Sequence, residues 1–269
     1  WVDHVLGWSR LWWIPAGMPA SAGAYVHYHL EELLAVACLE SWRHGSRLIG
    51  EDLGTVEPAL QRALRRHDVA GMRVAVFDLD ASPDTPLSPP KTTVAYVDTH
   101  DTATFAGFLG GSEIDLRASL GLLGPAAART ARARRAGVRR AIEGRLLGKR
   151  PRRGEQPALA VLAALLEELG RSEAELVLVN LEDLWAEVDP HNVPGTTTEH
   201  ANFARRLRRS TEDLACDGEL LAVLGRLDAA RRDRREKSEQ EVSRGRRGGH
   251  DRAEPLAVRG MPTRGRDRG

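Results

Sequence analysis

The stretch RLIGEDLG at residues 47–54 leads from a short apolar run directly into a carboxylate, Glu51. The same arrangement recurs in TTVAYVDTHD at 92–101, where a β-branched run precedes Asp101, and a third acidic residue, Asp3, stands near the start of the chain. In a parallel sheet, side chains just beyond the carboxyl ends of neighbouring strands lie along one edge. The pattern therefore predicts carboxylate chemistry at one end of a barrel.

Apolar runs and helical patterns alternate along the rest of the chain. The stretch from Trp12 to Gly23 is interrupted by Pro and Gly, so we expect it to be a loop. Residues 30–43 have the spacing of a helix whose apolar face carries Leu30, Leu33, Leu34, Ala37 and Cys38. The other expected elements are strand 47–50, a helix that starts at 57–58 and runs through 60–67, strands 72–80 and 92–98, helix 156–170 and strand 175–180.

The predicted fold class is α/β, because near-continuous apolar strands alternate with helices, as in a parallel sheet covered by helices. A five-strand piece of a (β/α) barrel is the expected architecture, with residues 1–225 as one domain. Residues 226–269 are rich in Arg and Gly and show no period, so they are predicted to be a disordered tail. RNA binding by such a tail is an alternative, but solvated tails of this composition are commoner, and translation past an original stop codon would also produce one.

Composition excludes several classes of function. The formal charge of +1 comes from 39 basic and 38 acidic residues, so neither nucleic acid nor an acidic membrane surface is an expected partner. Cys38 and Cys216 lack the spacing of a disulfide framework or a zinc site, and a cytoplasmic location is expected. No stretch has the ~18 apolar residues of a membrane span. No cofactor or metal is expected, because the adjacent His100-Asp101 pair lacks further ligands.

Each carboxylate also has a plain structural interpretation. A single Asp or Glu after a strand is usually a loop residue or a helix N-cap, and Asp52 rather than Glu51 could make the local bonds of the EDLG turn. Because a carboxylate follows more than one predicted strand, a shared catalytic site is favoured over separate structural roles.

Several separated motifs carry a resemblance to a known family. The chain from residue 1 to about 210 resembles the 4-alpha-glucanotransferases of the amylomaltase type, glycoside hydrolase family 77. The motifs stand in the family's order, and each lies where the pattern predicts the end of a strand. They are VDHVLGW (2–8), GEDLGTV (50–56), THDTATFAGF (99–108), VNLEDLW (179–185), NVPGT (192–196) and NFARR (202–206).

The resemblance implies a retaining enzyme on a (β/α)8 barrel, here strands 4 to 8, acting on maltooligosaccharides and 1,4-alpha-glucans. By motif, Asp3 resembles the nucleophile, Glu51 the general acid/base and Asp101 the transition-state stabiliser. Asp3 must stay ionised while Glu51 is protonated, and a retaining pair lies ~5–5.5 Å apart. The substrate-binding residues that the resemblance implies are His4, His100, Trp12 or Trp13, Asp80 and Asn192.

The chain departs from the family pattern at its start. Relatives have an Arg two residues before the nucleophile, where Trp1 stands, and such a cation lowers the pKa of a neighbouring carboxylate by about 1 to 3 units. The first three strands of the family barrel are absent, so we expect a fragment with poor stability and little activity. The alternatives are an alpha-glucan hydrolase and a non-catalytic barrel remnant.

Overall fold

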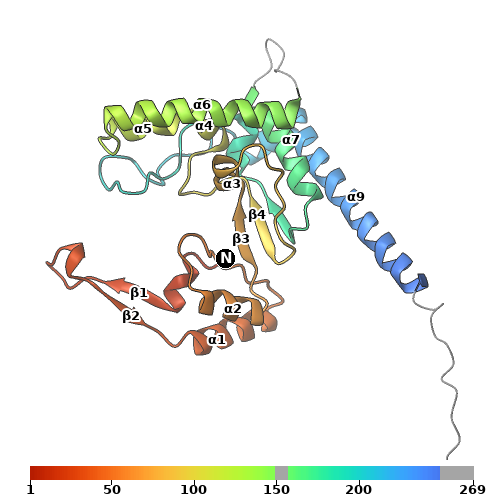
Figure 1. The fold of residues 1–269 in the computed structure, drawn as a ribbon, viewed down its shortest axis with the longest axis horizontal. Helices are drawn as coiled ribbons and strands as arrows, with labels where there is room; N and C mark the ends of the chain where they lie inside the picture. Colours follow the sequence, from red (N-terminus) through yellow and green to blue (C-terminus); the bar gives the residue numbers. More distant parts are fainter. Residues whose placement is uncertain (149–156, 249–269) are drawn as a thin grey trace, which may run out of the picture.

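A parallel sheet forms the centre of the computed structural model, which describes residues 1–148 and 157–248 (Figure 1). Its strands are β3 (Gly71–Val74), β4 (Thr93–Tyr96) and β5 (Leu176–Leu178), in that order. Two isolated parallel bridges, Ile49↔Ala70 and Val2↔Gly50, extend the same pattern toward the start of the chain. Five parallel segments therefore follow each other in chain order, which confirms the predicted α/β class and parallel pairing.

Helices connect and cover these strands, and three of them were predicted from their apolar spacing. They are α1 (Leu30–Arg43), α2 (Pro58–Arg66) and α7 (Pro157–Arg171). In α1 only Leu34 of the predicted apolar face is fully buried, and Leu33 is 40% exposed, because the described residues cover α1 on one side only. The other helices before α7 are α3 (Ala75–Ala81), α4 (Phe105–Gly110), α5 (Ser112–Ser119) and α6 (Pro125–Leu147).

The predicted strand 72–80 is wrong in its second half. β3 ends at Val74, and α3 begins at once, with Ala75, Val76 and Leu79 turned into the core. Buried positions at this spacing suit one face of a helix, and a short run of apolar residues does not distinguish a helix from a strand by its period. Tertiary packing decides between the two.

The expected loop at 12–23 is confirmed over most of its length, as the connection of an antiparallel hairpin, and is wrong at Trp12 and Trp13, which lie in the first strand of that hairpin. β1 (Arg10–Trp13) pairs with β2 (Ala24–His27), and the short 3-10 helix η2 (Ala20–Ala22) lies between them. Trp12 lies opposite Tyr25 in the register, and their ring centroids are 4.9 Å apart in an edge-on arrangement. Such cross-strand aromatic pairs stabilise hairpins, and sequence periodicity does not reveal them across a Pro- and Gly-rich connection.

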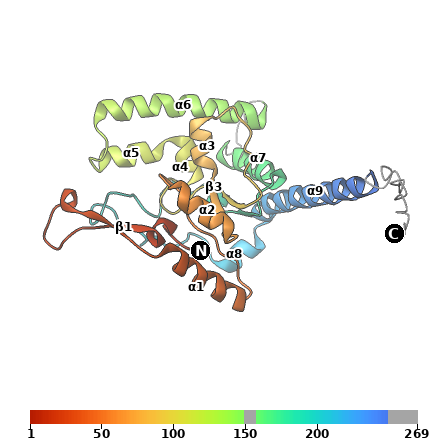
Figure 2. The same ribbon diagram turned by 60° about the horizontal axis from the view of Figure 1, so that its bottom comes forward.

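The predicted disordered tail is wrong over residues 226–248, because α9 (Gly218–Gly248) includes them. Helix α9 lies against α7 at its start and then projects beyond the other elements (Figure 1, Figure 2). Its buried Leu227 and Ala230 face α7, and Arg226 pairs with Glu167. The few apolar residues of this segment are spaced to meet a partner helix, which overall composition does not show. Residues 249–269, the rest of the predicted tail, lie outside the described residues.

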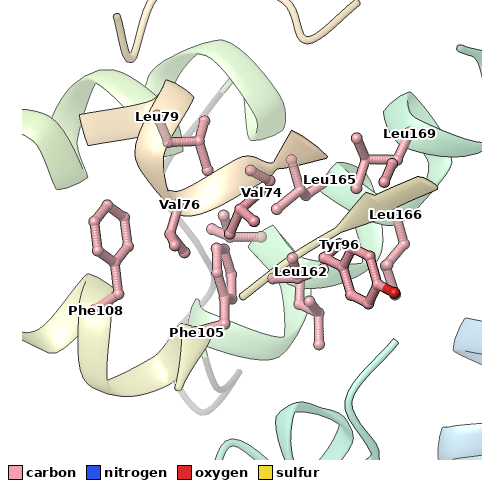
Figure 3. Packing of buried hydrophobic residues seen from close by; sticks show 14 of the residues in the cluster. Val74, Val76, Leu79, Tyr96, Phe105, Phe108, Leu162, Leu165, Leu166 and Leu169 are labelled. Atoms are coloured by element: carbon pink, nitrogen blue, oxygen red, sulfur yellow. The ribbon is translucent and has the colours of Figure 1, made fainter. Parts of the chain in front are cut away.

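The core has two parts. The larger cluster packs the strands against α3, α4 and α7, and Figure 3 shows Phe105 and Leu162 at its centre beside Val74 and Tyr96. The smaller cluster joins α1 and α2 to the 3-10 helix η1 (Val5–Trp8). Within the described residues, no helix combines the length and the apolarity that crossing a membrane would require. The remaining elements are the 3-10 helix η3 (Leu181–Trp185) and α8 (Thr211–Cys216).

Candidate active site

Backbone hydrogen bonds bring the first two acidic motifs together. The Val2 N–H donates to the Ile49 carbonyl (2.8 Å), and the Glu51 N–H donates to the Val2 carbonyl (2.9 Å). The Val5 N–H then donates to the Glu51 carbonyl at 3.1 Å. Asp3 and Glu51 therefore follow adjacent parallel segments at the same edge of the sheet, as the sequence predicts.

His4 completes this junction through its backbone. It adopts the left-handed conformation (φ 46°, ψ 60°), which is uncommon for a residue other than glycine. This turn directs the His4 N–H to Glu51 Oε2 at 2.8 Å. The strained backbone of His4 thus holds the carboxyl group of Glu51.

Asp3 and Glu51 are linked by a side-chain hydrogen bond, and their pKa values move in opposite directions. The hydrogen bond from Glu51 lowers the pKa of Asp3, and the nearby His100 and His4 lower it further. Burial raises the pKa of Glu51, and the hydrogen bond to Asp3 raises it again. The two pKa values are therefore moved apart in the directions that suit a nucleophile, Asp3, and a general acid, Glu51.

Position 1 departs from the family pattern beside this pair. The separation of ~5–5.5 Å between the carboxyl groups of a retaining pair stays a prediction. Trp1 carries no donor fork for Asp3, and its ring instead packs edge-on against Tyr96 at 4.9 Å. The hydrogen bond with Glu51 is therefore the largest of the causes that lower the pKa of Asp3.

The third motif joins the site from the end of β4. A tight turn holds it, since the Thr99 N–H donates to Thr102 Oγ1 at 2.9 Å. Asn192 Nδ2 donates to Asp101 Oδ1 at 2.6 Å, and His100 Nε2 lies 3.6 Å from the same oxygen. His100 also acts on the charges of Asp3 and Glu51, so the structure brings His4, His100, Asp101 and Asn192 to the same edge.

Two predicted substrate aromatics lie outside this group. Trp12 and Trp13 are on β1, and each ring N–H is already used within the hairpin segment, to the Ala20 carbonyl (3.1 Å) and the Tyr28 hydroxyl (2.8 Å). Both rings are largely exposed, at 45% and 58%. No hydrogen bond or ring contact of the described residues joins either to the carboxylates.

Asp80 is also separate from the site. It lies near the end of α3, and both of its carboxylate oxygens accept from Arg134 of α6, at 2.9 and 2.7 Å. Arg135 lies 3.6 Å from the same group. The structure thus gives Asp80 a contact that joins α3 to α6, and its contact with substrate stays a prediction.

Sequence reasoning missed a buried polar layer behind Asp101. Asp98 and Asp183 are each 2% exposed, and Glu187 is fully buried against Arg205 and Arg208. A cavity of about 350 Å³ opens beside this layer; its walls include His100, Asn180, Glu182 and His191. These residues belong to the motifs THDTATFAGF, VNLEDLW and NFARR or lie near them, so the family motifs were the signal in the sequence that could have pointed to this layer. The structure also shows which acidic residue makes the local bonds of the EDLG turn. Asp52 accepts a hydrogen bond from the Met72 N–H at 2.8 Å, and Glu51 faces Asp3.

Comparison with known proteins gives consistent results. The family described as 4-alpha-glucanotransferase matches residues 1–211. The 4-alpha-glucanotransferase of Mycobacterium tuberculosis is 36% identical over 209 residues, which are 75% of this chain and 29% of that protein. The Haemophilus influenzae 4-alpha-glucanotransferase is 31% identical over 217 residues, 77% of this chain and 31% of that protein.

Solved structures agree with these relatives. The amylomaltase of Corynebacterium glutamicum matches with a TM-score of 0.71 and 27% identity, over 86% of this chain and 35% of its own. The Streptococcus agalactiae amylomaltase, solved in complex with acarbose, shares the fold with a TM-score of 0.58 at 21% identity, over 84% and 39% of the two chains. This chain thus spans about a third of the length of its relatives. With three quarters of its own length aligned to them, the chain belongs to the 4-alpha-glucanotransferase family, glycoside hydrolase family 77.

Proposed function

We propose that this chain carries the catalytic carboxylates of a 4-alpha-glucanotransferase, which transfers a segment of a 1,4-alpha-glucan to a new 4-hydroxyl group of an acceptor glucan. The observation that carries the proposal is the Asp3–Glu51 pair at the ends of adjacent parallel segments, with the pKa of Asp3 lowered and that of Glu51 raised. Family membership supports the choice of maltooligosaccharides and 1,4-alpha-glucans as substrates.

The reaction is a double displacement. The Asp3 carboxylate attacks the anomeric carbon and forms a glycosyl ester, while Glu51 gives its proton to the departing 4-oxygen. Glu51, now ionised, takes a proton from the 4-hydroxyl group of the acceptor, and that oxygen displaces Asp3. Asp101, fixed by Asn192, accepts hydrogen bonds from ring hydroxyls as positive charge develops on the sugar. The hydrogen bond between Asp3 and Glu51 must open to admit the sugar.

The architecture that fits this role is strands 4 to 8 of a (β/α)8 barrel. Five parallel segments in chain order, with the acidic motifs at one edge, support it. Residues 1–225 remain our proposed domain, although α9 crosses its end. A cytoplasmic location and the absence of any nucleic-acid partner also remain proposals.

A chimera tests the function directly. Residues 1–211 replace the matching segment of the M. tuberculosis relative, and the purified protein is incubated with maltotriose. We expect longer oligosaccharides together with glucose, and a loss of about 10³-fold or more in Asp3→Asn and in Glu51→Gln. Asp84→Asn, in an exposed loop, is the matched control and should keep full activity.

Other outcomes would identify the alternatives. Glucose and maltose without longer products would indicate a hydrolase, which shares the ester intermediate. A folded chimera that makes no product and binds no acarbose would indicate a non-catalytic remnant and refute the proposal.

The residue at position 1 offers a second test. Trp1→Arg places a guanidinium beside Asp3, which lowers the pKa of that carboxyl further and gives it donors that compete with Glu51. We expect the chimera with Trp1→Arg to be more active than the chimera with Trp1, measured as the rate of glucose release from maltotriose. Equal rates would show that the residue at position 1 does not limit the reaction.

A further inference from the structure

Two acidic side chains lie buried against each other behind the Thr99–Thr102 turn. Asp98 follows β4, Asp183 lies in η3, and each is 2% exposed. No Lys, Arg or His of the described residues forms an ion pair with either of them. Two buried carboxylates without a cation would repel each other and lose their hydration, so this arrangement needs another source of stability.

The hydrogen bonds show where that source is. Asn180 Nδ2 donates to Asp98 Oδ1, and the Phe105 N–H donates to Asp183 Oδ1 at 2.9 Å. The remaining oxygen of each group, Oδ2, is buried and meets no N–H or hydroxyl donor among the described residues. Ionised carboxylates only accept hydrogen bonds, so a proton between the two groups is what satisfies both.

The titration behaviour agrees with this geometry. Burial raises the pKa of Asp98 well above its usual range, and the charge of Asp183 and the hydrogen bond to it act in the same direction. Burial raises the pKa of Asp183 to about 6, while the hydrogen bonds from Phe105 and Asp98 act against that rise. The hydrogen bond between the two groups raises the pKa of Asp98 and lowers that of Asp183, which makes Asp98 its donor and Asp183 its acceptor.

We propose that Asp98 and Asp183 share one proton, and that this pair is a latch that positions the turn carrying His100 and Asp101. The turn is tied at both ends to the same side chain, because Asp183 receives the proton of Asp98 before the turn and the N–H of Phe105 after it. The shared proton does not depend on which reaction the protein catalyses. Only the statement that the latch positions Asp101 for a sugar rests on the proposed function.

Other charged groups surround the pair and are already partnered. Glu182, beside Asp183, pairs with Arg205 and His191, and Glu187 pairs with Arg205 and Arg208. Two histidines, His100 and His191, line the adjacent cavity. Their effect is present in every variant, so it cancels when a variant at position 98 is compared with the parent.

The sign of the pH dependence follows from the raised pKa. Unfolded Asp98 loses its proton near pH ~3.9, whereas the folded pair retains it, so stability falls as pH rises through this window. Above about pH 6 Asp183 is ionised in both states and only Asp98 still holds the extra proton. There the unfolding equilibrium constant should rise up to about tenfold per pH unit.

The experiment compares urea unfolding of the 269-residue chain and its Asp98→Asn variant from about pH 6 to about pH 8. Asn keeps the shape, donates an N–H to Asp183 and cannot ionise, so the variant should lack this tenfold-per-unit rise. Asp84→Asn, in an exposed loop, should behave as the parent chain. Equal pH dependence in the parent and in Asp98→Asn would overturn the proposal.

Carbon-13 NMR of the Asp side chains reads the proton without relying on unfolding. We expect the Asp98 carboxyl to remain protonated at neutral pH, and an Asp98 that titrates near about 3.9 would overturn the proposal.

Hydrogen exchange at the Phe105 amide measures whether the pair holds the turn in place. After correction for intrinsic rates, this amide should lose protection at alkaline pH in the parent chain and keep it in Asp98→Asn. An inactive chimera with a protonated Asp98 would refute the proposed function and leave the latch intact.

Discussion

The contact between α7 and α9 can be tested with a single methyl group at Gly170. A Cβ atom there would lie 2.9 Å from the Ala230 Cβ and 3.1 Å from Leu227 Cδ1, both on α9. Replacing a helical Gly by Ala normally stabilises by up to about 1 kcal/mol, and by less here because α7 ends at Arg171. Overpacking a tight contact costs about 1–3 kcal/mol. The cost of overpacking should exceed the gain in helix propensity, so we expect Gly170→Ala to lower the free energy of unfolding by about 1–2 kcal/mol.

The chain provides a matched control in α6. A Cβ at Gly137, in the interior of that helix, would meet nothing within 4 Å, so Gly137→Ala should stabilise by about 0.5–1 kcal/mol. Urea unfolding followed by circular dichroism measures both. Adding Ala230→Gly to Gly170→Ala removes the opposing methyl and should restore part of the loss, as a favourable coupling in a double-mutant cycle. If Gly170→Ala is as stable as Gly137→Ala, α9 does not pack on α7 as described.

Two further predictions concern buried charge and the catalytic pair. Glu187→Ala removes the buried acceptor of the Val188 and Asp189 N–H groups, while its partner Arg208 (2.9 Å) is 60% exposed and can be hydrated. It should lower the free energy of unfolding by about 1–3 kcal/mol in urea titrations, against little change in the exposed control Glu199→Ala, and an unchanged stability would contradict this. Asp3→Asn removes a charge and a hydrogen bond that raise the pKa of Glu51, so carbon-13 NMR should show that pKa falling while staying above its usual range, since burial is the larger cause. An unchanged pKa of Glu51 would show that the two carboxyl groups do not interact.

Much of the site could be predicted from the sequence because its motifs follow parallel strands. Residues placed just after such strands reach one edge whatever the intervening helices do, so Asp3, Glu51 and Asp101 were found by position alone. Asn192 was found only through the family motif, and the structure gives it a contact of 2.6 Å with Asp101. Asp80 follows a run that reads as a strand, but α3 carries its side chain to Arg134 instead.

Elements whose stability depends on distant partners were predicted less well. The hairpin of β1 and β2 is stabilised by a pairing such as Trp12 with Tyr25 across a 3-10 helix, and α9 by the contact that Leu227 and Ala230 make with α7. Composition and period describe only local tendencies, and they indicated a loop and a disordered tail at these places. Packing outweighs such tendencies wherever a partner covers the apolar side chains.

The sequence by itself determined the order of strands, the positions of the acidic motifs and the family, because each depends on neighbouring residues along the chain. Only the tertiary structure decided in which direction the pKa of each carboxyl group is shifted. Asp3 meets Glu51, and Asp98 meets Asp183, across large separations in sequence. Burial and the nearest donor set the pKa of a carboxyl group, and both exist only once the chain has folded.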